Sequence, residues 1–278
     1  MNAKNFMSWR DYSESELERQ YTPASCVGDI QNFLDQYASG GAQSRLTIRH
    51  EKLTYGQHAD EWLWFAPSTG TTNRRAKRLV AFVHGGFWRR LSADDGTFLT
   101  RCFQQLGFDF ASINYSLCPN EPLENLIDQT RRAIGFLQTT HDAEKITLIG
   151  HSAGAHLIAM ALCQSNTVKF AKAILVSGIF DLEPIVKTSV NEAAQLNKKS
   201  ARRLSPIHLI SRASDTPLTV IWGENETDEF KRQSRDFASS WTQERTHSQV
   251  VTGEISGRNH FDILYDLSTH DVIGLPNG

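Results

Sequence analysis

The stretch Leu148 to Leu162, LIGHSAGAHLIAMAL, constrains the fold of this chain more than any other segment. Its first residues are apolar, as in a strand buried on both faces, and its last residues have the pattern of an amphipathic helix. Only the five residues Gly150-His151-Ser152-Ala153-Gly154 remain for the turn between them. A strand that turns so sharply into a helix belongs to a βαβ unit, which favours a mostly parallel sheet.

The same alternation of apolar strands and helical patterns continues along the chain. We expect strands at 46–53, 60–65, 78–84, 108–114, 146–150, 172–177, 218–222 and 249–255. We expect helices at 14–21, 95–105, 123–140, 153–164, 230–240 and from about 261. Because no helix separates the first two strands, that edge of the sheet is predicted to be antiparallel. A capping-box spacing of Ser13 and Glu16 supports the first helix.

We interpret the chain as a single α/β domain over residues 1–278. The N-terminal segment 1–45 is expected to pack on this domain. The stretch 181–211 is polar and helical in pattern and interrupts the alternation, so it is interpreted as a small insertion or cap over the sheet. No feature determines the oligomeric state, and a homodimer is compatible with the sequence.

Charge and composition argue against several classes of partner. The 29 basic and 31 acidic residues leave a net charge of −2, which gives no reason to expect nucleic acid or an anionic membrane as a partner. The basic run at 74–78 is interpreted as a solvated loop. No apolar run approaches the ~18 residues of a membrane span, and the first twenty residues lack the apolar region of a signal peptide. A cytoplasmic location is therefore expected.

The four cysteines predict neither disulfides nor a metal site. They are scattered through the chain without a C-x-x-C pair, at positions Cys26, Cys102, Cys118 and Cys163. In a cytoplasmic protein such cysteines are expected to be reduced thiols. Metal ligation by these cysteines is therefore not expected, and the sequence contains no motif from which we expect a cofactor.

A G-x-S-x-G sequence between a strand and a helix is typical of the nucleophile elbow of the α/β-hydrolase fold, whose central sheet carries helices on both faces. Ser152 is then expected at positive φ, with its hydroxyl lifted clear of the sheet. Gly150 and Gly154 are expected to be glycines because a Cβ at either position would collide where strand and helix meet.

An oxyanion hole for Ser152 is expected from two places. The backbone N–H of Ala153 lies at the start of the helix, where it has no intrahelical partner. The sequence VHGGFW follows an earlier strand, where this fold places a loop of the HGG type. Gly85 and Gly86 in that loop are expected to point further N–H groups at the substrate oxygen.

The base and acid of a triad are chosen by chain order. In this fold the acid and then the histidine follow the nucleophile. His260 follows the last strand, where the base belongs, whereas His156 lies too close to Ser152 in sequence and His208 is interpreted as structural; His247 and His270 are further histidines beyond Ser152. Glu226 is the fourth residue from Gly223 and is predicted to be the acid, while Asp228 fits the N-cap of the next helix.

Aromatic residues suggest a flat aryl pocket. The candidates to line it are Phe6, Trp9, Tyr12, Phe87, Trp88 and Tyr115. Phe87 and Trp88 are favoured because they lie on the HGG loop itself, whereas for each of the others the sequence favours a place in the core over one in the pocket. An aniline is a better leaving group than an alkyl amine, since its nitrogen lone pair delocalises into the ring, and a formyl group needs only a small acyl site.

Over most of its length the chain resembles the kynurenine formamidase (arylformamidase) family of α/β-hydrolases. The resemblance lies in the segments LERQYTP, HGGFW, NYSLCP, GHSAGAHL, DEFKRQS and NHFDIL. It implies metal-independent hydrolysis of N-formylkynurenine to kynurenine and formate. It also implies that Ser152 is the nucleophile, His260 the base and Gly85-Gly86 the oxyanion loop. The family usually has aspartate where this chain has Glu226.

Two other functions remain open at this stage. A carboxylesterase, or a hydrolase of other aryl amides or carbamates, would use the same residues on a different acyl group or leaving group. A receptor with this fold would bind a small molecule without turning it over. The presence of Ser152, Glu226 and His260 together argues against a receptor, because binding alone does not require all three.

Overall fold

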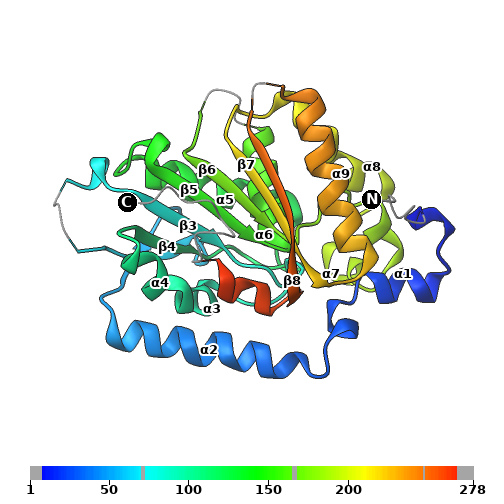
Figure 1. Cartoon of the computed structure of the whole chain (residues 1–278), viewed down its shortest axis with the longest axis horizontal. Helices are drawn as coiled ribbons and strands as arrows, with labels where there is room; N and C mark the ends of the chain where they lie inside the picture. Colours follow the sequence, from blue (N-terminus) through cyan, green and yellow to red (C-terminus); the bar gives the residue numbers. More distant parts are fainter. Residues whose placement is uncertain (1–7, 70–72, 165–167, 247, 268–278) are drawn as a thin grey trace.

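An eight-stranded sheet runs through the residues that the structure, a computed structural model, describes: 8–69, 73–164, 168–246 and 248–267 (Figure 1). Its strands lie in the order β1-β2-β4-β3-β5-β6-β7-β8. In chain order they are β1 (Glu51–Thr54), β2 (Trp62–Ala66), β3 (Leu79–Val83), β4 (Asp109–Ile113), β5 (Ile146–His151), β6 (Lys172–Val176), β7 (Leu218–Asn225) and β8 (Val250–Asn259). Strand β2 is antiparallel to both β1 and β4, and all other neighbours are parallel. The mostly parallel sheet and its antiparallel edge are therefore confirmed.

Helices cover both faces of the sheet, as predicted (Figure 1). They are α1 (Glu14–Gln20), α2 (Ile30–Thr47), α3 (Ala93–Gly96), α4 (Thr100–Gln105), α5 (Leu123–Gln138), α6 (Ala153–Cys163), α7 (Asn191–Ala194), α8 (Lys198–Arg203) and α9 (Asp228–Glu244). Alternate residues of β3 enter two cores, because successive side chains of a strand point to opposite faces. Val83 packs in the core with α5, α6 and α9, while Phe82 packs in the core with α2 and α4.

Helix α6 is buried all round rather than amphipathic, which corrects the interpretation of its sequence. Every residue from Ala153 to Cys163 is buried. The physical reason is that the sheet covers one side of the helix while α5 and the end of the segment 181–211 cover the others. A helix enclosed in this way needs no polar face.

The sequence patterns gave no helix between residues 22 and 45, yet the longest helix of the structure lies there. Helix α2 begins after Asp29, whose side chain accepts a hydrogen bond from the N–H of Gln31 at 2.8 Å. Its apolar residues Ile30, Phe33, Leu34 and Tyr37 have helical spacing and pack on the smaller core. Because the helix runs to Thr47, the first strand begins at Glu51 rather than at 46.

The segment 181–211 is less polar than its sequence suggested. It consists of short helical turns: η6 (Pro184–Lys187), α7, α8, η7 (Pro206–His208) and η8 (Ile210–Arg212). Leu182, Ile185 and Leu204 are among its residues that are buried in the larger core. The final helix of the described chain is a short 3-10 helix, η9 (Asp262–Asp266); what was expected beyond residue 267 lies outside the described residues.

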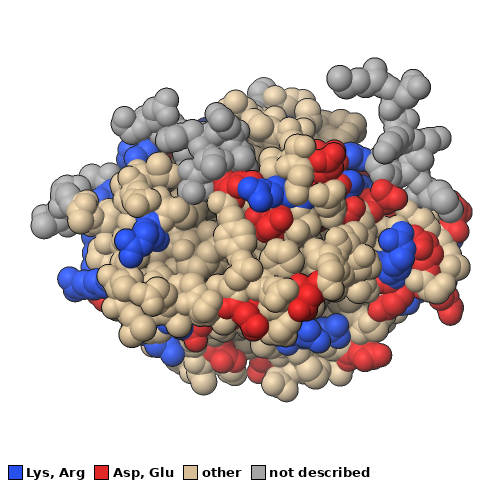
Figure 2. Space-filling view, turned by 60° about the horizontal axis from the view of Figure 1, so that its bottom comes forward, with Lys and Arg blue, Asp and Glu red and all other residues tan. Residues whose placement is uncertain are grey.

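Charged side chains of both signs are mixed over the face in Figure 2, without a large patch of one sign. The basic run at 74–78 is not simply solvated: Arg75 pairs with Asp142, and the Lys77 ammonium lies 3.5 Å from the buried Asp109 carboxylate. The four cysteines all lie in the described part of the chain and form no disulfide there. Among the described residues, no helix combines the length and apolar character needed to cross a membrane.

We predict that Tyr37→Phe destabilises the fold whereas Tyr265→Phe does not. The buried Tyr37 hydroxyl donates to the Phe261 carbonyl oxygen at 2.5 Å and joins α2 to the chain after His260. Its loss leaves that oxygen unpaired and should cost about 1–2 kcal/mol. Tyr265 is 40% exposed and bonds only to the Gln36 side chain, so its loss should cost less than about 0.5 kcal/mol. Urea unfolding with equal m-values measures both; equal midpoints would contradict the prediction.

Candidate active site

Ser152 lies at the tip of the turn between β5 and α6, with φ 54° and ψ −116°. Residues other than glycine rarely adopt a positive φ, so the strained turn expected from the sequence is present. The N–H of Ser152 donates to the carbonyl oxygen of Val176 at 2.8 Å, which ties the turn to β6. The N–H of Ala153, the first of α6, has no intrahelical acceptor and is available beside the serine, whereas the Ala155 N–H already donates to the Ser152 carbonyl oxygen at 3.0 Å.

Two glycines let the strand and the helix approach each other. A Cβ on Gly150 would lie 2.5 Å from the carbonyl oxygen of Gly154. A Cβ on Gly154 would overlap the carbonyl oxygens of Val83 and His84 at the end of β3. The start of α6 is therefore packed directly onto the strand that leads into the HGG loop.

The Gly85 loop, residues 84–91, lies against Ser152. A Cβ built on Gly85 would stand 3.1 Å from the Cβ of Ser152. Gly86 has φ +95°, and Phe87, Trp88 and Leu91 also have positive φ. These conformations curl the loop so tightly that a Cβ on Gly86 would meet the backbone of Arg90.

Tyr115 supports the Gly85 loop from behind and does not line a pocket, which corrects the expectation for this residue. Its hydroxyl lies 2.9 Å from the carbonyl oxygen of His84 and 3.1 Å from that of Gly85, so it can donate to either. Its ring stacks on the His84 imidazole at 4.2 Å between centroids. Because N–H and C=O point in opposite directions in a trans peptide, the N–H groups of Gly85 and Gly86 face away from Tyr115.

Trp88 is also buried away from the cavity, so of the two aromatic residues on the loop Phe87 alone lines it. The Trp88 Nε1–H donates to Nδ1 of His156 at 3.2 Å, because a buried indole needs an acceptor. His156 Nε2 in turn donates to the carbonyl oxygen of Leu204 at 2.8 Å, so this histidine is structural. Trp9 and Tyr12 do not line the cavity either, and Phe6 lies outside the described residues.

The structure brings Glu226 and His260 together. Glu226 Oε2 lies 2.9 Å from His260 Nδ1, and both side chains are buried. The other carboxylate oxygen, Oε1, accepts hydrogen bonds at 2.6 Å from the Ser177 hydroxyl and from the Gly223 N–H. Three donors therefore hold this carboxylate in one orientation.

Asp228 is exposed and lies apart from this pair, at the first residue of α9. The N-cap of α9 is Thr227, so the prediction that Asp228 is the cap was wrong by one residue. The Thr227 hydroxyl does not cap the helix but donates to the carbonyl oxygen of Gln20 at 2.6 Å, and the Gln20 Oε1 accepts from the Glu229 N–H at 3.0 Å, so another segment satisfies the first turn.

Sequence reasoning missed His151 and Ser177. His151 occupies the variable position before Ser152, lines the cavity, and its Nε2 lies 2.8 Å from the carbonyl oxygen of His260. It thereby fixes the backbone that carries the His260 ring. Ser177 directly follows the neighbouring strand β6 and has φ 50°. A polar residue at the carboxyl end of each of two adjacent parallel strands was the signal that could have identified both.

A cavity of about 390 Å³ opens beside Ser152 and His260. Its walls come from the N-terminal segment, α2, the Gly85 loop and the segment 181–211, and most of its lining side chains are apolar or aromatic. The lining residues are Glu18, Tyr21, Thr22, Pro23, Ala24, Ile30, Leu34, Tyr37, Gly86, Phe87, Arg89, Arg90, Leu91, His151, Ser152, Ser189, Val190, His260 and Phe261. Helix α2, which the sequence patterns did not reveal, is therefore part of the site.

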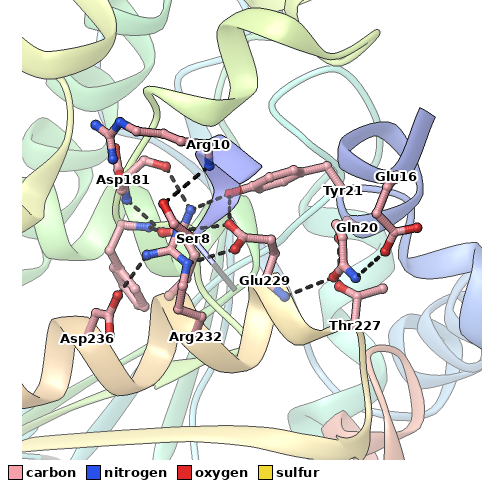
Figure 3. Close-up of polar contacts among 12 residues, drawn as sticks. Ser8, Arg10, Glu16, Gln20, Tyr21, Asp181, Thr227, Glu229, Arg232 and Asp236 are labelled. Carbon is pink, nitrogen blue, oxygen red and sulfur yellow. Dashed lines mark hydrogen bonds and ion pairs between the residues drawn. The ribbon is translucent and has the colours of Figure 1, made fainter. Parts of the chain in front are cut away.

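A buried polar network clamps the N-terminal segment onto α9 (Figure 3). The Tyr21 hydroxyl donates to the carboxylate of Glu229 at 2.8 Å and accepts from the Gln233 amide at 2.7 Å. Arg232 neutralises Glu229 with two parallel hydrogen bonds of 2.7 and 2.8 Å. The segments LERQYTP and DEFKRQS, singled out in the sequence, thus contact each other, and Tyr21 is held in the cavity wall.

In the part of the chain that the structure describes, Asp181, Glu183 and His208 bring ligand-type atoms within 4.8 Å of one another. Glu183 is already paired with the guanidinium groups of Arg10 and Arg202, at 3.2 and 3.1 Å. These cations supply the positive charge that a metal ion would bring, so the group is explained as an ion-pair cluster.

Three buried histidines around the elbow predict a loss of stability on mild acidification. Burial lowers the pKa of His84 and His156 to about 4 and that of His151 to about 3. In the unfolded chain these pKa values return to about 6.5, so unfolding takes up protons below that pH. The free energy of unfolding should fall as the pH drops from 6.5 towards 4.5, by up to about 1.4 kcal/mol per pH unit for each histidine. His156→Gln should give a shallower slope in urea titrations; a flat profile in the parent protein would contradict this.

Comparison with known proteins identifies the family. Residues 67–241 match the BD-FAE family. Kynurenine formamidases of Danio rerio and Salmo salar are 31% and 30% identical to this chain, over 93% and 95% of it and 93% and 94% of their own lengths.

Solved structures show the same fold. A protein from Silicibacter sp. with a provisional thioesterase assignment superposes with a TM-score of 0.81 at 23% identity, covering 94% of this chain and 99% of its own. An esterase of Pyrobaculum calidifontis gives 0.67 at 17% identity and 91% coverage of both chains. With the elbow, the Gly85 loop and the buried Glu226–His260 pair in one α/β-hydrolase fold, this hydrolase belongs to the kynurenine formamidase family.

Proposed function

We propose that this protein is a serine hydrolase that cleaves an aryl formamide, such as N-formylkynurenine, to the aryl amine and formate. The observation that carries the proposal is the meeting of two features in one cavity. Ser152 stands at positive φ between the Gly85 loop and the start of α6, and His260, hydrogen-bonded to Glu226, lines the same cavity. A serine, an oriented imidazole and nearby free N–H groups are the parts of an acyl-transfer site.

In the proposed reaction the Ser152 hydroxyl oxygen attacks the formyl carbon while His260 Nε2 takes the hydroxyl proton. The N–H groups of Ala153 and of the Gly85 loop stabilise the negative charge that develops on the formyl oxygen. The carbon–nitrogen bond then breaks, and His260 returns the proton to the leaving aryl amine. Water, deprotonated by His260, releases formate from the serine ester and restores the enzyme.

Glu226 is proposed to hold the Nδ1–H of His260, which leaves Nε2 free as the base. Glutamate is one methylene longer than the aspartate usual in the family. Its carboxylate is nevertheless fixed by the Ser177 hydroxyl and the Gly223 N–H, so the extra length need not loosen the contact with the imidazole. Only a well-oriented carboxylate is required at this position.

The aryl part of the proposed substrate is supported by the lining of the cavity and by the names of the relatives. Phe87, Tyr21 and Phe261 offer aromatic surface beside Ser152. The fish relatives are named kynurenine formamidases, and they align with nearly the whole of this chain.

A series of acyl lengths on one aniline leaving group tests the proposal. We expect kcat/KM to be greatest for formyl and to fall for chains longer than about acetyl, because a formyl group needs only a small acyl site and such a site excludes a longer chain. Ser152→Ala is the control and should lower kcat by on the order of 10⁴–10⁶. Faster turnover of the octanoyl anilide than of the formyl anilide would contradict the formamidase proposal and would indicate a long-acyl hydrolase. Retention of most activity in Ser152→Ala would end the serine mechanism.

The acid is tested with two matched substitutions. Glu226→Gln should leave a folded protein with kcat lowered by on the order of 10⁴, because the imidazole loses the group that fixes its tautomer. Asp228→Asn should keep its activity and lose at most about 1 kcal/mol of stability, since it removes a charge from the first turn of α9. Steady-state kinetics measures kcat of both variants, and urea unfolding measures their stability. A nearly inactive Asp228→Asn beside an active Glu226→Gln would assign the acid role to Asp228 instead.

A further inference from the structure

Two arginines on the Gly85 loop line the cavity without a partner. Arg89 and Arg90 follow Trp88, and both are among the cavity residues. Neither guanidinium has a hydrogen bond or ion pair with any residue of the described chain. Arg89 is half-buried, whereas Arg90 is exposed. A partly desolvated guanidinium without an acceptor is unfavourable, so a group that is absent from the free protein would complete it.

Other partly buried arginines of this protein are paired. Arg232 makes two hydrogen bonds to Glu229, and Arg258 makes two to Asp266, at 2.5 and 2.7 Å. Arg45 bonds to the carbonyl oxygen of Asp94 and to the Thr97 hydroxyl. Compared with these arginines, Arg89 is unusual, because it is similarly half-buried but its guanidinium has no hydrogen-bond acceptor in the described chain.

The carboxylate in the cavity wall does not satisfy Arg89. Glu18 accepts hydrogen bonds from the Ser189 N–H at 2.8 Å and from the Ser189 hydroxyl at 2.5 Å, and it makes no ion pair with Arg89 in the described chain. Apart from Glu18, Arg89 and Arg90, the wall that the described residues form contains no lysine, arginine, aspartate or glutamate. The open charge that the cavity offers to a ligand is therefore positive.

We propose that Arg89 is a substrate-binding residue that recognises a carboxylate on the amine half of the substrate. The proposal rests on the proposed function and deepens it, because it makes the substrate class an aryl formamide that carries a carboxylate rather than one that lacks it. The planar guanidinium donates two parallel hydrogen bonds to a carboxylate. The α-carboxylate of N-formylkynurenine lies at the end of the side chain that is ortho to the formamide, on the part of the molecule that leaves with the amine.

The placement of Arg89 on the Gly85 loop suits this role. The loop begins at Gly85 beside Ser152, continues through Phe87 in the cavity wall, and reaches Arg89 two residues later. One curled segment thus offers N–H groups for the formyl oxygen, an aromatic face for the ring and a cation for the carboxylate. A substrate that engages all three is oriented along the loop.

Direct binding tests the proposal apart from catalysis. In Ser152→Ala protein, the dissociation constants of N-formylkynurenine and of its carboxamide, which lacks the negative charge, are measured by calorimetry. We expect the carboxylate form to bind about 10- to 100-fold more tightly, as a charge-assisted hydrogen bond predicts. When Arg89→Gln is added to the Ser152→Ala protein, the two ligands should bind with nearly equal dissociation constants. Arg89→Lys in place of Arg89→Gln should keep part of the preference for the carboxylate. Arg212→Gln removes an exposed arginine outside the cavity and should leave the ratio unchanged.

Turnover by the protein with Ser152 intact separates the two hypotheses. If formanilide and N-formylkynurenine are both cleaved but the carboxylate and carboxamide bind equally, the function stands and the Arg89 subsite is overturned. If neither formamide is cleaved while the binding ratio persists and depends on Arg89, the formamidase proposal fails and the anion subsite stands. An equal weakening of both ligands by Arg89→Gln would reduce Arg89 to a structural residue and overturn the subsite.

Discussion

The close packing of Gly154 against the carbonyl oxygens of Val83 and His84 is the constraint on which the rest of the site depends. It joins the start of α6 to the end of β3 without any intervening side chain. Ser152 precedes α6 and the Gly85 loop follows β3. This one contact therefore fixes the position of the serine relative to the loop. A side chain at position 154 would separate two segments that must lie within a few ångströms of each other.

Around that contact most polar groups are paired within the protein. Glu226 has three donors, His156 uses both ring nitrogens, and His151 bonds to the backbone of His260. Burial keeps His151 and His156 neutral, because it lowers the pKa of each far below that of an exposed imidazole. Such an arrangement is rigid, and preorganised groups of this kind need little rearrangement as a reaction proceeds.

The N-terminal segment becomes part of the cavity because it is clamped to α9. The Tyr21–Glu229–Arg232 network is buried and internally neutralised, which compensates the desolvation of its charges. The Phe230 ring, next to Glu229, lies 4.5 Å from the His260 ring. The same short stretch of α9 therefore holds Tyr21 in the cavity wall, through Glu229, and packs against the His260 ring, through Phe230.

Sequence alone determined the alternation of strands and helices along the chain, the elbow at Ser152 and the pairing of His260 with Glu226, because these follow from short-range periodicity and from chain order in a known fold. It did not reveal α2, whose helical spacing is carried by few apolar residues, and it assigned Trp88 and Tyr115 to a cavity that they support from behind. Their orientation depends on acceptors supplied by His156, His84 and Gly85. Only the tertiary structure decides which side chains reach a common cavity, because that depends on contacts between segments far apart in the chain.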